Sequence, residues 1–411
     1  MAGRRSKRRR RRRKTKQHKH VVDLPNDIIL NILSRLPAHF LHRRARPVCK
    51  TWADLMHLPL FKETNFLHSK PVLLVLDHVC NPNEACFFEM REGKLQIKGP
   101  KLELPGIILR SSGGVLLLTK YINKKQLFYV ANPVTMQAVE LPKLSALVSW
   151  SGASIAYLPR TGELKVVCIG EDRDNGICHW YILTIGSNMS WRQFDSTVPG
   201  CGPEVCYKTK SISAGGVLYW RIVSLNRTSP PFVKSIRIAA LDLGDESLHH
   251  LWVPEECNEE HCELLKMGNS LGCISWRSTA TGGRTETMKI WLLKDLRRNE
   301  WAITHRFDLD ESHPLRMAVS VPAACLENHQ ILIFRLLRYQ YDSTAQKHFD
   351  LLFELNWKTG KWKYFMNIVS MSQVIEVHTD SLFSFSSLSL KQFGGVVFSS
   401  EGGLIGSLEL G

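Results

Sequence analysis

A short phrase of small residues followed by apolar and β-branched residues recurs through most of this chain. Its copies read SGGVLLL at residue 112, SGASIAYL at 151, AGGVLYW at 214 and SLGCISW at 270, with a looser copy, AACLENHQILIF, at 323. We expect each copy to open a β-strand that is followed by further strands and a polar turn. A unit repeated at intervals of roughly 40 to 60 residues cannot bury both of its faces alone. The pattern therefore predicts a β-propeller, for which we expect six blades, with an irregular β-sandwich or barrel as the alternative.

A tryptophan stands in the polar turn of four of these units. The positions are Trp191, Trp252, Trp301 and Trp362. Large aromatic rings supply much of the apolar area that a protein buries. We therefore expect all four rings to fill the space between adjacent blades.

Residues before about position 70 follow a helical pattern instead. Apolar residues recur there with the 3.6-residue period of an amphipathic helix, at Ile28, Ile29, Ile32, Leu33 and Leu36. Pro25 suits the first helical position, and Pro37 ends this helix. A second helix, closed by Pro59, has its apolar stripe at Val48, Trp52, Leu55 and Met56. The predicted fold class is a small all-α unit followed by an all-β domain.

The net charge of +16 is concentrated at the N-terminus. Residues 1–20 hold 12 of the 54 lysines and arginines and no acidic residue, which leaves the rest of the chain at +4. Such a segment cannot bury apolar surface, so we expect a disordered basic tail. The candidate nuclear-import signal within it comprises Arg8, Arg9, Arg10, Arg11, Arg12, Arg13 and Lys14. The alternatives are an arm that binds RNA or an acidic surface, and a simple solvated tail.

Composition narrows the class and the compartment. A hydrophobic fraction of 44% with 22% charged residues is typical of a folded protein. The 11 cysteines are odd in number and contain no Cys-x-x-Cys pair, which indicates reduced thiols and a location in the nucleus and cytoplasm. No apolar run of about 18 residues is present, so we expect neither a membrane span nor secretion.

Chemical motifs are sparse. Cys257, His261 and Cys262 lie close together in the sequence, but their spacing matches no zinc finger or ribbon. There is no phosphate-binding loop, dinucleotide fingerprint or nucleophile elbow. We therefore expect no metal, no cofactor and no catalytic residue.

The helical region resembles an F-box. LPNDIILNILSRLP followed by LHRRARPVCKTWADLM matches that family's pattern from residue 24 to 60. Two positions depart from it: Ala45 stands where the family commonly has Phe, and Pro47 where it often has Cys. We expect both departures to thin the packing around the second helix without abolishing it.

This resemblance implies docking on the Skp adaptor of a cullin–RING ubiquitin ligase. The residues implied to bind the adaptor are Leu24, Pro25, Ile28, Ile32, Leu33, Leu36, Pro37, Leu41, Val48, Cys49 and Trp52. For Leu24 and Pro25 the contact role is favoured. Ile32 and Trp52 are equally suited to hold the helices together, and Leu33, Val48 and Leu55 have the same alternative role.

The β-rich remainder resembles the plant F-box associated domain over nearly all of residues 70–388. The phrases that carry this resemblance, in order, are GGVLLL, YVANPVTMQAVELP, YLPRTGELKVVCI, GSNMSWRQF, GGVLYW, IAALDLGDE, MKIWLLKD and VIEVHTDSLFSF. Residues 156–159 read AYLP, where the family tends toward a Gly-Tyr-Asp pattern. The expected organisation is a tail over 1–20, an F-box over 21–66, the associated domain over 70–388, and an extension or closing strands over 389–411.

Together the two resemblances imply a substrate-recognition subunit of an SCF-type ligase without catalytic residues of its own. Its F-box would bind the adaptor and, through it, the cullin and RING subunits, while the β-domain captures a target protein for degradation. The alternatives are a nucleic-acid-binding propeller that uses the arginine-rich tail, and a propeller enzyme with an added helical domain. The charge of only +4 outside the tail opposes the first alternative, and the lack of a catalytic constellation opposes the second.

Overall fold

The computed structural model of this chain describes residues 24–392 with internal gaps. The segments outside it are 1–23, 78–83, 92–93, 98–101, 124, 145–146, 159, 172–177, 187–188, 195–209, 227–232, 259–260, 279–284, 310–318, 327–330, 343–344, 369–372, 386–390 and 393–411. The predicted basic tail with its import signal, and most of the predicted extension over 389–411, lie outside the described residues. So does Pro159 of the atypical AYLP sequence.

The first described part of the chain is helical. Its segments are α1 (Asn26–Ser34), α2 (Ala38–Phe40), the π-helical turn η1 (Leu41–Ala45), α3 (Lys50–His57) and α4 (Pro59–His68). Pro25 and Pro37 are the N-caps of α1 and α2, one residue earlier than we predicted for Pro25. Pro59, predicted only to close a helix, also begins α4. Proline is tolerated there because the first N–H of a helix has no partner within the helix.

A buried asparagine joins the last helix to the first. The side-chain amide of Asn65 in α4 donates to the backbone carbonyls of Ser34 at 2.9 Å and Leu36 at 2.8 Å. These carbonyls lie at and just after the C-terminal end of α1, where a helix leaves its acceptors without internal partners. The two bonds therefore fix how α4 packs against α1.

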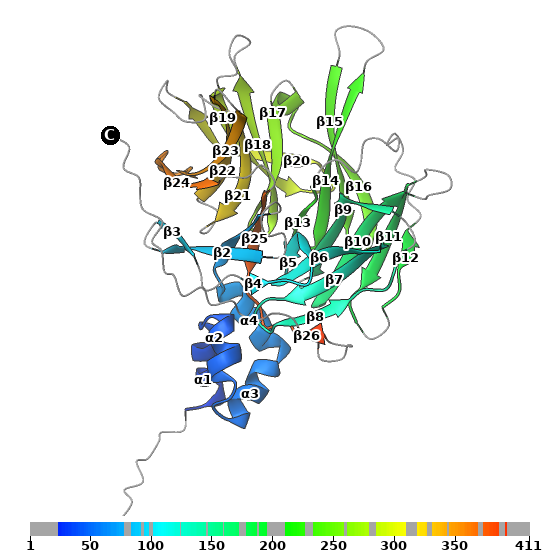
Figure 1. Cartoon of the computed structure of the whole chain (residues 1–411), viewed down its shortest axis with the longest axis vertical. Helices are drawn as coiled ribbons and strands as arrows, with labels where there is room; N and C mark the ends of the chain where they lie inside the picture. The colour runs from blue at the N-terminus through cyan, green and yellow to red at the C-terminus, as the bar shows by residue number, and fades with distance from the viewer. Residues whose placement is uncertain are drawn as a thin grey trace, which may run out of the picture.

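The helical unit packs on one end of the β-domain (Figure 1). Its core, which includes Leu33, Leu41 and Phe61, also contains Val134 and Leu382 from the β-domain. The ring of Phe66 in α4 lies 5.9 Å from that of Tyr157. The helices and the β-domain thus share buried apolar contacts.

The β-domain is a six-bladed propeller made of antiparallel sheets (Figure 1). Blade 1 contains β1 (Pro71–Asp77), β2 (Glu84–Arg91), β3 (Lys94–Ile97), β4 (Leu102–Glu103) and β25 (Gln373–Thr379). Blade 2 contains β5 (Ile107–Ser112), β6 (Val115–Ile122), β7 (Lys125–Asn132), β8 (Gln137–Glu140) and β26 (Lys391–Gln392). Blade 3 contains β9 (Leu147–Leu158), β10 (Glu163–Glu171), β11 (Cys178–Thr184) and β12 (Arg192–Phe194).

The other three blades have four strands each. Blade 4 contains β13 (Ile212–Ala214), β14 (Val217–Asn226), β15 (Val233–Asp242) and β16 (Ser247–Trp252). The 3-10 turn η2 (Glu255–Asn258) leads to blade 5, with β17 (His261–Met267), β18 (Ser270–Ser278), β19 (Thr285–Asp295) and β20 (Glu300–Asp308). Blade 6 contains β21 (Val319–Leu326), β22 (Ile331–Asp342), β23 (Ala345–Asn356) and β24 (Trp362–Ile368).

The ring closes by pairing the two ends of the β-domain. Strand β25 pairs antiparallel with β1, with Leu73 opposite Val377. The innermost strands β5, β9, β13, β17, β21 and β25 contact one another in that order around the ring. Closure of this kind leaves the first blade dependent on a strand from the C-terminal part of the chain.

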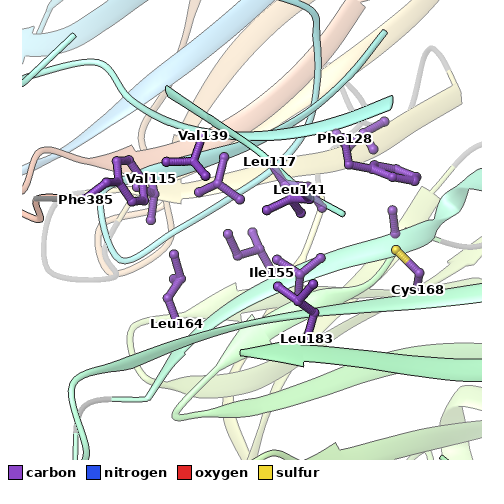
Figure 2. Packing of buried hydrophobic residues seen from close by; sticks show 14 residues of the cluster. Val115, Leu117, Phe128, Val139, Leu141, Ile155, Leu164, Cys168, Leu183 and Phe385 are labelled. Carbon is purple, nitrogen blue, oxygen red and sulfur yellow. The ribbon is translucent and has the colours of Figure 1, made fainter. Parts of the chain in front are cut away.

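Each pair of adjacent blades encloses its own apolar core. Between blades 2 and 3, Leu117 and Val139 face Ile155 and Leu164, and Phe385 joins them from the segment after β25 (Figure 2). Comparable clusters lie between the other neighbouring blades. A single blade therefore could not bury its apolar faces, as the repeat pattern predicted.

The recurring phrase occupies two different places in the blades. In blades 2 and 4 its glycine pair forms the turn from the innermost strand to the second strand, so the phrase opens the second strand of the blade. In blade 3 the phrase SGASIAYL forms no such turn, because it lies inside β9, the innermost strand. The glycine is required in blade 2, since Gly114 has φ +77° and a Cβ there would lie 2.1 Å from Ser381 Oγ.

The four turn tryptophans do not share one role. Trp191 and Trp301 pack partly against the cores between blades, and their indole N–H groups donate to the carbonyls of Pro142 at 2.7 Å and Trp252 at 3.0 Å in the preceding blade. For Trp252 and Trp362 the prediction was wrong, because both side chains are exposed. Trp252 ends an outermost strand, whereas Trp191 and Trp301 stand at or next to the start of one.

Candidate functional site

An exposed apolar surface lies on the helical unit. Ile28 and Ile32 are four residues apart on α1, which places them on one face of the helix, and Leu24 lies two residues before the helix begins. All three side chains are exposed. Val48, just before α3, is exposed as well. We call the residues Leu24, Ile28, Ile32 and Val48 the apolar face. Several exposed apolar residues gathered on one small unit commonly mark an interaction site.

The structure divides the predicted adaptor-binding residues by exposure. The exposed members are Leu24, Pro25, Ile28, Ile32, Pro37, Val48 and Cys49. Leu36 and Trp52 are partly buried and pack against the core of the helical unit. Leu33 and Leu41 are buried in that core, where they support the helices and contact no solvent.

The two departures from the F-box pattern have different surroundings. Ala45 is buried in the core of the helical unit, so its small side chain is part of the packing. Pro47 is exposed. The Ala45 side chain therefore contributes to the packing of the helices, whereas that of Pro47 lies at the surface.

Further exposed apolar side chains were not predicted from the sequence. Phe40 lies at the end of α2, and Leu58, Leu60 and Leu67 lie in or next to α4. Their spacing alone gives no signal, because apolar residues at helical spacing are usually buried. Their exposure becomes visible only when the helices are packed.

Cationic side chains lie close in sequence to the apolar residues of the helical unit. Arg43, Arg44 and Arg46 are exposed in and after η1. Burial, with the nearby Arg46 charge, lowers the pKa of Lys62, and burial with Arg46 and Arg43 lowers the pKa of His42. The unit thus presents apolar surface together with positive charge.

The cysteines singled out in the sequence lie in a core between blades. Cys257 and Cys262 are buried between blades 4 and 5, together with Cys273, whose Sγ lies 3.9 Å from that of Cys257. Hydrogen bonding with Cys257 and Cys262, and then burial, raises the pKa of the Cys273 thiol, which stays protonated at neutral pH. Within the described part of the chain, no group of three or more His, Cys, Asp or Glu residues could hold a metal ion.

None of the described helices is long and apolar enough to cross a membrane.

The architecture defines a class of protein in which a helical unit with an exposed apolar face is fused to a closed β-propeller. Two family models match the chain in the same order. Residues 22–64 match the F-box domain, and residues 76–334 match the F-box associated beta propeller domain. The chain belongs to the family of F-box proteins with an F-box associated β-propeller domain. Members of the F-box protein family are typically non-catalytic subunits of SCF ligases.

The chain is similar to F-box proteins of Arabidopsis thaliana. F-box protein DOR is 26% identical over 312 residues, which cover 70% of this chain and 74% of that protein. F-box protein At5g49610 is 24% identical over 310 residues, covering 69% of this chain and 79% of that protein.

Similarity to solved structures is weaker. TolB from Acinetobacter baumannii aligns with a TM-score of 0.40 and 12% identity over 75% of this chain and 65% of that chain. The periplasmic gluconolactonase PpgL of Pseudomonas aeruginosa aligns with a TM-score of 0.40 and 10% identity over 75% of this chain and 99% of that chain. TM-scores of this size support no functional inference.

Proposed function

We propose that this chain is the substrate-recognition subunit of an SCF-type ubiquitin ligase. In this proposal the helical unit binds the Skp adaptor and the propeller binds a target protein. The observation that carries it is the apolar face, which lies within the residues matched by the F-box model. Burying that face against an adaptor would remove apolar area from water, which favours association.

The exposed residues of the predicted set are the proposed contact residues. Leu24, Ile28, Ile32 and Val48 supply apolar area, and Pro25 and Cys49 adjoin them in sequence. Pro37, the exposed N-cap of α2, is the remaining member of the set. Leu33 and Leu41 act indirectly, because they hold the helices in the arrangement that exposes the apolar face. The exposed arginines of the unit favour an adaptor surface with acidic groups nearby.

The contact between the helical unit and the propeller would hold the two binding sites of the proposed receptor in a fixed relation. Val134 and Leu382 of the propeller share a core with the helices, so an adaptor bound to the helices would also hold the propeller in place. A target on the propeller would then stay close to the ubiquitin-conjugating enzyme carried by the cullin and RING subunits. Such tethering raises the effective concentration of one reactant near another. The chemistry itself belongs to the other subunits.

Affinity purification from the protein's own cell extract tests this proposal. The tagged full-length chain should retain the Skp adaptor and the cullin subunit. A variant lacking residues 1–20 serves as the control, because the basic tail alone can collect nucleic acid by charge. Recovery of ribonucleoprotein by the full chain, with no adaptor recovered by either form, would instead support the nucleic-acid-binding alternative.

The basic tail is proposed as the nuclear-import signal of this receptor. The supporting observation is the acid-free run from Arg8 to Lys14 ahead of α1, which an import receptor could reach without unfolding the helices. A fluorescent fusion lacking residues 1–20 should lose nuclear enrichment, measured as the ratio of nuclear to cytoplasmic signal. Its melting temperature should match that of the full chain. An equal ratio with and without the tail would contradict the import role.

A further inference from the structure

A cluster of charged side chains lies at the centre of the propeller ring. It comprises Arg110 on β5, Lys210 just before β13, Lys266 on β17 and Glu376 on β25. These positions belong to the innermost strands of blades 2, 4, 5 and 1, or directly precede one. We call the four residues the central basic cluster.

Direct contacts across the ring join Lys210 to Glu376 and Arg110 to Ser211. The ammonium group of Lys210 lies 2.7 Å from Glu376 Oε1 and donates to the carbonyl of Ile375 at 2.9 Å. A lysine of blade 4 thereby reaches the innermost strand of blade 1, on the opposite side of the ring. Arg110 Nε donates to Ser211 Oγ at 3.1 Å, and the hydroxyls of Ser154 and Ser211 are hydrogen-bonded to each other.

Positive charge exceeds negative charge in this cluster. Glu376 attracts Arg110 and Lys266 as well as Lys210, so a single negative charge faces three positive charges. The other acidic residue on the innermost strands, Glu263, pairs with Arg221 of β14 at 2.9 Å. His378 on β25 is hydrogen-bonded to Ser111 at 2.9 Å. The carboxylate of Asp380 lies 3.5 Å from the ring nitrogen of His378 and 3.8 Å from that of His39 in the helical unit. Among the described side chains, two positive charges of the cluster are therefore unbalanced.

Burial makes this imbalance costly. It lowers the pKa values of Arg110 and Lys266, and the charge of Glu376 opposes both shifts. Arg110 is only 8% exposed, and a guanidinium keeps its proton at physiological pH. Its Nη2 has no hydrogen-bond partner among the described residues. A buried charge that is only partly balanced is unfavourable, so a counter-ion at this point would stabilise the fold.

We propose that the central basic cluster binds one phosphate group, either as free phosphate or as a group carried by the target protein. The proposed ligands are Arg110, Lys210 and Lys266, with the hydroxyls of Ser154 and Ser211 nearby. A phosphate carries about two negative charges near neutral pH, which matches the excess of positive charge. The unpartnered Nη2 of Arg110 supplies a charge-assisted donor for one of its oxygens.

Thermal unfolding of the full-length protein with inorganic phosphate tests the site. Compared with sodium chloride of equal ionic strength, phosphate at one hundred times its dissociation constant should raise the melting temperature by about 4 °C. Titration calorimetry of the same protein should detect the binding heat. No rise and no heat would overturn the proposal.

Two substitutions separate a specific site from the general stabilising effect of phosphate salts. Lys266→Met should abolish the phosphate-dependent rise while leaving the melting temperature in chloride unchanged or higher, because it removes an unbalanced charge. The control is Lys165→Met, which removes a buried lysine that has its own carboxylate, Glu246, at 3.1 Å. It should melt lower in both salts but keep the same rise with phosphate. An equal rise in all three proteins would mean a bulk salt effect and overturn the site.

A second variant tests the site independently, in case Lys266→Met does not fold. The side chain of Lys210 is partly exposed, so Lys210→Gln should fold, and it should weaken phosphate binding at least tenfold. Unweakened binding by this variant would also contradict the proposal.

A phosphoserine peptide distinguishes the two sources of phosphate. Displacement of bound phosphate by that peptide, and not by its unphosphorylated form, would identify a group carried by the target, whereas retention would identify free phosphate.

Discussion

Replacing Trp220 with alanine is expected to lower the free energy of unfolding of the propeller by about 3 to 5 kcal/mol. The Trp220 side chain is only 1% exposed and lies in the core between blades 3 and 4. Its ring meets that of Trp180 at 4.9 Å between centroids and 82° between planes. Alanine would leave a cavity and end this edge-to-face contact, which itself contributes about 1 kcal/mol. The melting temperature should fall by about 4 to 7 °C.

Trp252→Ala is the matched control for this prediction. Its side chain is 50% exposed, and its described ring contact is with the Arg237 guanidinium at 5.8 Å. An exposed cation–π contact contributes about 0.5 to 1 kcal/mol, so this variant should melt close to the parent protein. Equal destabilisation by the two substitutions would refute the division between buried and exposed tryptophans.

Replacing Ile28 and Ile32 together with alanine is expected to weaken adaptor binding by about thirtyfold to nearly a thousandfold. The two side chains are 42% and 51% exposed on α1, so they would lose that exposed area on binding an adaptor. Each apolar contact residue of this size contributes roughly 1 to 2 kcal/mol. Alanine favours the helix, so the helical unit should remain folded. Titration calorimetry of the full chain with purified adaptor measures the change.

Leu60 and Leu67 provide the control pair. They are 69% and 71% exposed on α4, and their replacement by alanine removes a similar apolar area from the same unit. We expect their double variant to bind within about twofold of the parent, because neither belongs to the predicted contact residues. If this pair weakens binding more than the α1 pair does, the adaptor contact lies on α4 and the proposed contact residues are wrong.

The class of each domain could be predicted from the sequence because it depends on local patterns. The helical period near Ile28 and the Gly-rich phrases later in the chain describe how short segments bury one face. The exposure of single residues could not be predicted where two positions fit the same pattern. Ile32 and Leu33 both fit the apolar stripe of α1, yet one is exposed and the other buried. Packing of the helices with each other and with Val134 and Leu382 makes that distinction.

The sequence by itself determined the strand-and-turn units, the helical unit and the family of this protein. Each depends on residues close together in the chain, whose spacing sets local conformation. Tertiary structure alone decided the closure of the ring through β1 and β25, the exposure of Trp252, and the central basic cluster. Arg110 and Glu376 are remote in sequence and stand in unrelated phrases. They come together only because six blades closing into one ring bring their innermost strands around a common centre.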